Sequence, residues 1–252
     1  LVVNSFKLNT YVKTDTFALP NAESFAGWAN YIKGMTFGNY PFIKAVFYSL
    51  FITLVSSALI LICTSMAAWY VARVGSLFSK IVYYLCVFSM VVPFQMVMFT
   101  LSKTADTLKL NTPWTIPIIY LGFGAGLAIF MFVGFVKSIP LEIEEAAAID
   151  GCGPVKILYK IIAPMLSPSL VACGLFQFMW SCNDYMGPLL YVQTPSKYPM
   201  SIFVKLSMDA DSGFNWNRIL ALSLISIIPQ LVVFFCAQDA FIDGISAGAV
   251  KG

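Results

Sequence analysis

Five long stretches of the chain contain no Asp, Glu, Lys or Arg, and they constrain the fold more than any other feature. Each has at least 20 residues, about the length that an apolar helix needs to cross a bilayer. Backbone polar groups find no water inside lipid, so we expect these stretches to be helices rather than loops. The stretches are Ala45–Ala72, Ile81–Ser102, Leu110–Val136, Ile161–Asn183 and Ile219–Gln238.

The composition narrows the class of protein further. Of the 252 residues, 59% are hydrophobic and 11% are charged, against roughly 45–50% and 25% in ordinary soluble domains. A net charge of +3 with no basic run excludes a nucleic-acid binder. Histidine is absent, which removes Ser-His and His-metal chemistry, and no Cys-x-x-Cys pair supports a metal site. We therefore predict an all-α, polytopic transmembrane helix bundle, one domain over 1–252, that is not an enzyme and binds no metal.

The start of the chain and the orientation of the spans are less clearly defined by the sequence. The chain begins with the short apolar run Leu1, Val2 and Val3, which leads into polar residues up to Lys7. We expect residues 1–7 to be the end of a truncated first span, and a processed signal sequence or a plain tail is the alternative. Counts of Lys and Arg do not fix the orientation, because six lie on one side of the five spans and nine on the other.

The segment between the third and fourth spans has a helical pattern of its own. Pro140 suits the first turn of a helix, and the acidic residues that follow it favour the positive end of the helix dipole. Gly151 and Gly153 are expected to end this helix, Pro154 to open a second one and Pro164 to end that one. We predict a helix–turn–helix outside the bilayer whose alanine face lets another protein approach closely. A solvated linker is the alternative.

The same segment resembles the EAA loop of ABC importer permeases. The family pattern is E-A-A-x3-G-x9-I-x-L-P, and the sequence departs from it where Ala163 replaces the leucine. The match runs through Glu145-Ala146-Ala147, Gly151, Ile161 and Ala163-Pro164. Further stretches resemble the sugar-importing, maltose-type branch of these permeases. They are Asn4–Lys7, Asn183–Asp184 with Pro188–Leu190, and Gly244–Gly252.

This resemblance implies a permease subunit of an ATP-driven, binding-protein-dependent importer of a sugar or oligosaccharide in a bacterial inner membrane. Its implied partners are an ATPase subunit dimer, which holds ATP and Mg²⁺, a second related permease chain and an extracytoplasmic solute-binding protein. No cofactor is expected on this chain. Residues 138–166 would be a cytoplasmic coupling segment, and residues 187–218 an extracytoplasmic loop. The residues implied in coupling to the ATPase are Glu144, Glu145, Ala146, Ala147, Asp150, Gly151 and Pro164.

Polar and aromatic residues near the span edges are candidates for the solute path. Gln95, Asn183 and Asp184 lie within or beside spans, where polar groups are expected to face protein or water. Trp180 and Tyr185 are candidates for stacking on a sugar ring. Core packing or the interfacial aromatic belt is the alternative for either aromatic residue.

Other functions are open alternatives to a sugar importer. An ion-coupled secondary transporter usually needs ionisable groups deep in its spans, and these spans are almost free of them. An ABC importer of a non-sugar solute is a second alternative. No G-x-x-x-x-G-K-[ST] loop occurs, so the chain is not expected to hold ATP itself. The spacing of Gly122 and Gly126 predicts a close-packing patch between membrane helices.

Overall fold

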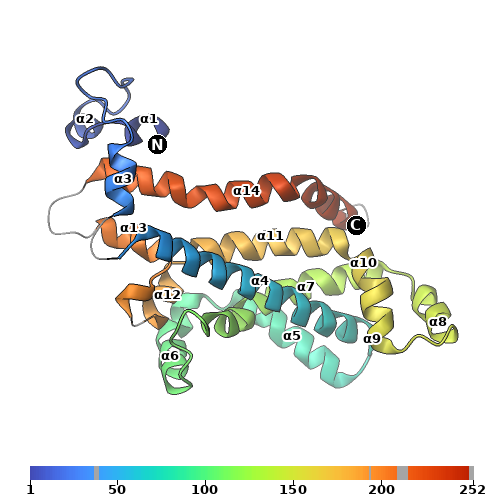
Figure 1. Ribbon diagram of the computed structural model, residues 1–252. Coiled ribbons are helices and arrows are strands. Elements are labelled where there is room, and N and C mark those ends of the chain that lie inside the picture. The colour runs from blue at the N-terminus through green and yellow to red at the C-terminus, as the bar shows by residue number, and fades with distance from the viewer. Residues whose placement is uncertain (37–39, 193, 209–214, 250–252) are drawn as a thin grey trace.

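The structure, a computed structural model, describes residues 1–36, 40–192, 194–208 and 215–249, with side chains described up to residue 242 (Figure 1). Every regular element in these ranges is a helix. The β contact that accompanies them is an isolated bridge between Lys7 and Phe25. The predicted all-α fold is therefore confirmed.

Three helices are long and apolar enough to cross a membrane on their own. They are α4 (Phe42–Arg73), α7 (Ile116–Ser138) and α14 (Trp216–Ala249). An uninterrupted helix satisfies the backbone polar groups within the segment, which is what a bilayer demands of a charge-free run. The first and fifth predicted stretches lie wholly inside α4 and α14. The third begins later than predicted, because residues 110–115 form bends and turns ahead of α7.

The second predicted stretch is a bent pair of helices rather than a straight span. Helices α5 (Leu77–Val91) and α6 (Phe94–Thr107) meet at Val92 and Pro93, where their axes differ by 110°. Pro93 has no N–H group to continue α5, and its ring disfavours the helical conformation at the residue before it. Val92 is accordingly extended, with φ −76° and ψ 114°. The absence of charged residues predicts how long an apolar segment is, but it does not predict whether the helix within that segment is straight or bent.

The fourth predicted stretch is also bent. Helix α9 (Pro154–Ile157) continues through a π-helical turn (Leu158–Ile162) into α10 (Ala163–Met165), and α11 (Ser167–Asn183) then turns away by 78°. The prediction that Pro164 ends the second short helix was wrong, because Pro164 lies inside α10. The wider π turn directly before it adjusts the hydrogen-bond ladder where Pro164 has no N–H to contribute.

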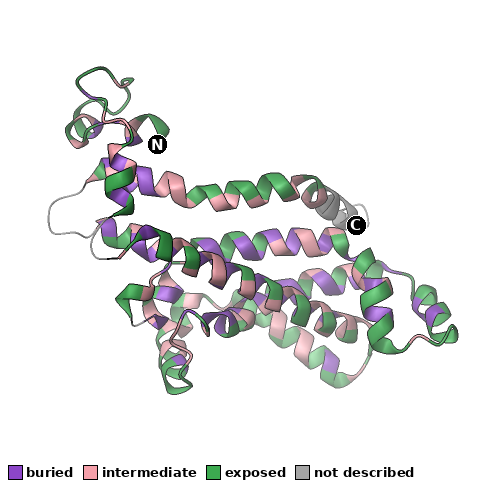
Figure 2. Cartoon of the chain, in the orientation of Figure 1, coloured by how far each residue is buried: buried purple, intermediate pink, exposed green. Residues whose placement is uncertain are grey.

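The core of the bundle lies among α4, α7 and α11. Helix α4 packs along both α7 and α11, and α14 packs on the far side of α11. The buried residues of the central cluster include Ile60, Ala68, Ala128, Phe132 and Cys173. Buried residues make up 56% of the apolar window of α7 but only 17% of that of α14, so α14 turns most of its surface outward (Figure 2).

Close packing on α7 depends on two glycines. A Cβ atom on Gly124 would lie 2.5 Å from Cδ1 of Ile60, and one on Gly126 would lie 2.7 Å from the carbonyl oxygen of Cys86. A Cβ atom on Gly122 would meet nothing within 4 Å. The predicted close packing is therefore confirmed at Gly126, while Gly122 packs against none of the described helices of this chain.

The two ends of the bundle carry different short helices. Helix α8 (Leu141–Ile149) lies with α9 at one end (Figure 1). The opposite end carries the helices α1 (Val2–Ser5), α2 (Asn9–Thr14), α3 (Ala29–Met35), α12 (Met186–Tyr191) and α13 (Met200–Met208), with a 3-10 turn at Pro195–Lys197.

The segment predicted as the loop 187–218 is partly built into the bundle. Met200 and Phe203 of α13 are buried in one cluster with Phe42, Phe178 and Leu222, which belong to α4, α11 and α14. This apolar contact fixes α13 against three long helices. The described part of the segment is therefore not a loose connection.

Candidate functional site

A cavity of about 720 Å³ lies among α5, α6, α7, α11 and α12. Val92 and Phe94 line it from either side of Pro93, so the bend between α5 and α6 forms part of its wall. Four of the five residues predicted for the solute path line this cavity. They are Gln95, Trp180, Asp184 and Tyr185.

Asp184 supplies the charge in the cavity wall, and three donors hold its carboxylate. The Tyr120 hydroxyl donates to Oδ2 at 2.7 Å, and the backbone N–H groups of Met186 and Gly187 donate to Oδ1 at 3.0 and 3.2 Å. These bonds offset the cost of removing a carboxylate from bulk water, and they satisfy free donors at the start of α12. Among the described lining residues there is no Lys or Arg, so the wall is negative.

Aromatic faces lie beside these polar groups. The Trp180 ring packs against the Tyr120 ring with centroids 4.9 Å apart, while 40% of Trp180 and 41% of Tyr185 remain exposed. A largely apolar cavity with a few convergent polar groups is the usual form of a small-molecule site. This wall is suited to a solute that has both apolar faces and hydrogen-bonding groups.

Sequence reasoning missed two residues of this wall. Gln177 is buried in the middle of α11, and its Nε2 donates to the carbonyl oxygen of Gly124 at 3.1 Å. An amide inside a charge-free span is expected to face protein or water, so the argument that singled out Gln95 applies equally to Gln177. Tyr120 gave no such signal, because the chain has 12 tyrosines and its partner Asp184 lies 64 residues away.

Asn183, the fifth predicted residue, lines a different groove. This groove, of about 530 Å³, lies between α11, α13 and α14. Asn183 and Gln230 exchange two side-chain hydrogen bonds there, of 2.9 and 3.1 Å. Tyr185 lines both spaces. The structure thus separates Asn183 from the other predicted residues, because its amide turns toward α14.

The predicted coupling residues lie on α8 and in the segment that follows it. Helix α8 starts directly after Pro140 and ends at Ile149. Gly151 then has a φ of +80°, in the left-handed region that favours glycine, and Pro154 opens α9. The predicted helix–turn–helix is therefore confirmed as local structure.

Helix α8 presents two different faces. Glu145, Ala146 and Asp150 are exposed, as are Gly151 and Pro164 beyond the helix. Glu144 and Ala147 are instead the two buried residues of α8, each 7% exposed. Residues three apart share a helix face, so this pair points into the chain itself. The predicted coupling residues Glu144 and Ala147 therefore do not belong to the exposed surface of α8.

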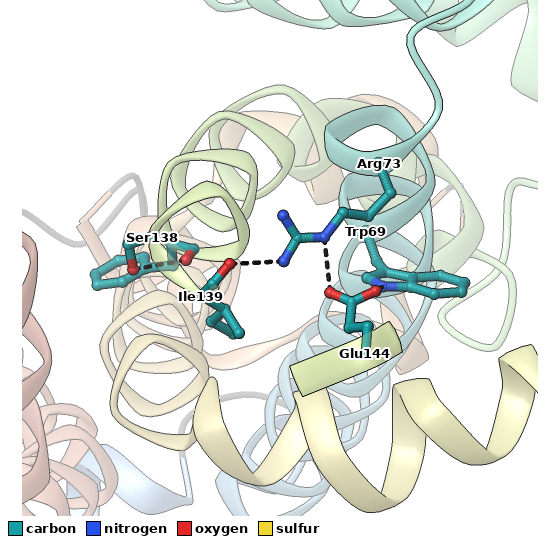
Figure 3. Close-up of polar contacts among 6 residues, drawn as sticks. Trp69, Arg73, Ser138, Ile139 and Glu144 are labelled. Atoms are coloured by element: carbon teal, nitrogen blue, oxygen red, sulfur yellow. Dashed lines mark hydrogen bonds and ion pairs between the residues drawn. The ribbon is translucent and has the colours of Figure 1, made fainter. Parts of the chain in front are cut away.

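Glu144 is held by two side chains of α4 (Figure 3). Nε of Arg73 donates to Oε1 at 2.7 Å, and Nε1 of Trp69 donates to Oε2 at 2.9 Å. Nη2 of Arg73 also donates to the carbonyl oxygen of Ile139 at 2.9 Å. Sequence reasoning missed Trp69 and Arg73. Their spacing of four residues at the end of a span was the available signal, since such residues share a helix face.

Comparison with known proteins identifies the family. Residues 60–245 match the family model described as "Binding-protein-dependent transport system inner membrane component". The chain belongs to this family. It is a multi-pass membrane permease of an ABC transporter and a transport subunit rather than an enzyme, as its sequence resemblance implied. Membership of this family removes the ion-coupled secondary transporter as an alternative.

Relatives match this permease over most of their length. The probable starch degradation products transport system permease protein AmyC of Thermoanaerobacterium thermosulfurigenes is 33% identical, with 100% of this chain and 89% of the relative covered. The multiple sugar-binding transport system permease protein MsmG of Streptococcus mutans is 28% identical, with 99% and 89% covered.

A solved structure supports the fold independently. The crystal structure of a bacterial ABC transporter involved in the import of the acidic polysaccharide alginate matches with a TM-score of 0.79. The match covers 95% of this chain and 88% of the other at 20% sequence identity. The bent helix pairs and the bundle thus form an ABC importer permease fold.

Proposed function

We propose that this permease imports a sugar or an oligosaccharide across a bacterial inner membrane. The observation that carries the proposal is the cavity in which Asp184 and Gln95 lie beside the exposed rings of Trp180 and Tyr185. Sugar rings present apolar C–H faces together with hydroxyl groups. Aromatic faces pack against the first, and carboxylate and amide groups bind the second.

The names of the relatives support a carbohydrate over a non-sugar solute. They refer to starch degradation products in one case and to multiple sugars in another. The arabinooligosaccharides transport system permease protein AraQ of Bacillus subtilis is 28% identical over 231 residues. These solutes differ in length and linkage but share the chemistry that the cavity wall suits.

In the proposed mechanism, α8 binds a partner ATPase and moves when that ATPase changes conformation during ATP hydrolysis. The exposed carboxylate of Glu145 makes a charge-assisted contact with a partner ATPase, and Ala146 allows the two proteins to approach closely. Gly151 provides the sharp turn that sets α8 apart from α9. ATP and Mg²⁺ are held by the ATPase, and this chain binds no cofactor.

The two ends of the bundle face different partners in this proposal. The end that carries α8 is cytoplasmic, and the end that carries 187–218 meets an extracytoplasmic solute-binding protein. A crystal structure of a bacterial alginate ABC transporter in complex with alginate pentasaccharide-bound periplasmic protein matches this fold with a TM-score of 0.65. A second, related permease chain would cover part of the outward surface of α14 and complete the pathway.

Purification of the permease from its native membrane in a mild detergent, followed by mass spectrometry, tests the assembly. We expect to recover an ATPase, a second permease and a soluble solute-binding protein. Recovery of the chain without an ATPase, while a cross-linker added before extraction also captures none, would contradict the proposed coupling.

Titration of the recovered binding protein tests the substrate class. Calorimetry with maltotriose, arabinotriose and raffinose is expected to detect binding of at least one sugar. Amino acids and inorganic phosphate serve as the comparison. Binding of a non-sugar solute in place of every sugar would overturn the carbohydrate proposal and leave the ATP-driven importer standing.

A further inference from the structure

Helix α8 is attached to the rest of the bundle by few side chains. Its two buried residues are Glu144 and Ala147. Ala147 packs in an apolar cluster with Val136 of α7 and Ile157 of α9, and Trp69 and Ala72 of α4 pack against the same cluster. Glu144 adds polar contacts with Arg73 and Trp69 of α4, which lie 71 and 75 residues away in the chain.

The contacts of Glu144 use both carboxylate oxygens. Arg73 donates to one oxygen and Trp69 to the other, and Glu144 is 7% exposed (Figure 3). An ionised carboxylate removed from water is stable when donors satisfy it. Each donor therefore depends on the negative charge and on the position of α8. Among the described hydrogen bonds and ion pairs, these are the ones that link α8 to α4.

Arg73 joins three helix ends at one point. It lies in the last turn of α4, where a cation also stabilises the negative end of the helix dipole. Its Nη2 donates to the Ile139 carbonyl oxygen, which follows the last residue of α7, while its Nε holds Glu144 of α8. The planar guanidinium group makes both contacts in fixed directions, and a lysine has no such fork.

Helix α4 in turn reaches the cavity wall. It packs along α7, where Ile60 of α4 leaves no room for a Cβ atom on Gly124. Gly124 and Tyr120 of α7 both line the cavity. Closely packed side chains thus connect α4 to α7, the helix that carries Gly124 and Tyr120 of the wall.

We propose that Trp69 and Arg73 are positioning residues that join α8 to α4, so that a movement imposed on α8 reaches α4 and the cavity as well as α7. The inference rests on the proposed function, in which an ATPase moves α8. Without these polar contacts, α8 would be linked to α4 only by the apolar packing of Trp69 and Ala72 on the cluster around Ala147, and to α7 and α9 by the chain as well.

Replacement of Glu144 by Gln tests the joint with little change in volume. An amide offers one acceptor oxygen and one NH2 group, so one of the two α4 donors meets another donor. In the complete complex in proteoliposomes, we expect solute moved per ATP hydrolysed to fall by roughly 2- to 30-fold, the range for residues that carry coupling between sites. The ATPase should still be recovered with the variant in wild-type amount.

Two further variants keep this experiment interpretable. Glu142→Gln makes the same change of charge at an exposed position of the same helix and should leave the ratio of solute to ATP unchanged. Trp69→Phe keeps an aromatic ring, although a smaller one, and removes the N–H donor, so a smaller fall in the ratio is expected. The double variant Trp69→Phe, Glu144→Gln should lose less than the sum of the two single losses in free energy, because both act on one contact.

A distance measurement distinguishes a joint from a merely structural contact. Tyr70 of α4 and Ile143 of α8 are both exposed, so spin labels attached there report the separation of the two helices. In the wild type we expect one narrow distance distribution that is the same with and without ATP and vanadate. In Glu144→Gln the distribution should broaden, and its mean should change when the nucleotide is trapped.

Wild-type coupling in Glu144→Gln, or a narrow distance that nucleotide does not change in this variant, would overturn the joint. So would loss of the ATPase from both Glu144→Gln and Trp69→Phe, because the contact would then serve assembly rather than transmission. Failure of the wild-type complex to move solute with ATP would contradict the proposed function instead. The two failures are thus distinguishable.

Discussion

The cavity and the α8 segment each hold an acidic side chain by hydrogen bonds, but the two side chains have different partners. Asp184 takes two of its three donors from the backbone directly after it and one from Tyr120. Glu144 takes both of its side-chain donors from α4. The first arrangement fixes the local shape of a wall, and the second ties separate helices together. A hydrogen-bonded carboxylate thus belongs to a cavity wall in one place and to a contact between helices in the other.

The two regions also differ in how the chain assembles them. The turn at Gly151 and the helix before it come from one continuous segment, so they fold from local rules. The cavity collects residues from Ser89 to Tyr191 on five helices. Changes in the turn should therefore affect coupling and leave solute binding intact, whereas changes in the wall should do the opposite.

Gly151→Val is expected to have the largest effect on this comparison. A β-branched residue at a φ of +80° costs about 1–3 kcal/mol, so the turn should re-form elsewhere and α8 should lose its orientation. We expect most ATP-driven uptake to disappear while solute binding persists, as measured in proteoliposomes. Gly153→Val is the control, because Gly153 has a φ of −71° and open space around it. Equal losses in both variants would contradict the special role of the turn.

Gly124→Ala tests whether the close packing of α7 behind the cavity wall contributes to stability. The added methyl group would overlap Ile60 and Gln177, which we expect to cost about 1–3 kcal/mol of stability. The apparent melting temperature of the purified complex should fall. Gly122→Ala adds the same methyl group two residues away into open space and should leave that temperature unchanged. A fall with Gly122→Ala alone would show that the packing of α7 has been misassigned.

Asp184→Asn removes the negative charge of the wall and keeps its size. Hydrogen bonds to a charged group contribute about 1.5–3 kcal/mol, so the apparent KM for the solute should rise roughly tenfold. Solute moved per ATP should stay the same. Asp15→Asn, an exposed acid at the end of α2, provides the matched control. A loss of coupling without a change in KM would show that Asp184 acts in the coupling of transport to ATP hydrolysis rather than in solute binding.

Trp180→Phe should have the smallest effect. The variant keeps an aromatic face but has less area, and contacts between aromatic groups contribute about 0.5–1.5 kcal/mol. We expect a modest rise in KM that is larger for longer oligosaccharides. Trp114→Phe is the control, since Trp114 packs on Phe51 outside the cavity. Uptake of short and long oligosaccharides provides the measurement, and an equal effect of both variants would speak against stacking at Trp180.

Much of the fold could be predicted from the sequence. The charge-free stretches locate α4, α7 and α14, because length and apolarity alone decide whether a helix can span a bilayer. The bends at Pro93 and before Ser167 could not be predicted. A proline frees the backbone to turn, but the direction of the turn is set by packing against other helices. A proline such as Pro93 therefore marks a place where a bend is possible and leaves its 110° angle undetermined.

The site was predictable where it is local and unpredictable where it depends on distant contacts. Glu145, Ala146 and Gly151 follow from a continuous motif, and the structure places them on an exposed surface and in a left-handed turn. The inward direction of Glu144 depends on Arg73, far back in the chain. Asn183 belonged to the predicted wall by its position beside Asp184. Its pairing with Gln230, 47 residues later, turns it to another groove.

Uptake by the reconstituted complex tests the proposed importer most directly. Proteoliposomes that contain the permease with its co-purified partners would be supplied with the binding protein and a labelled oligosaccharide. We predict uptake that requires both ATP and the binding protein and that vanadate abolishes. Uptake that an ion gradient drives without ATP, or that vanadate leaves unchanged, would contradict it.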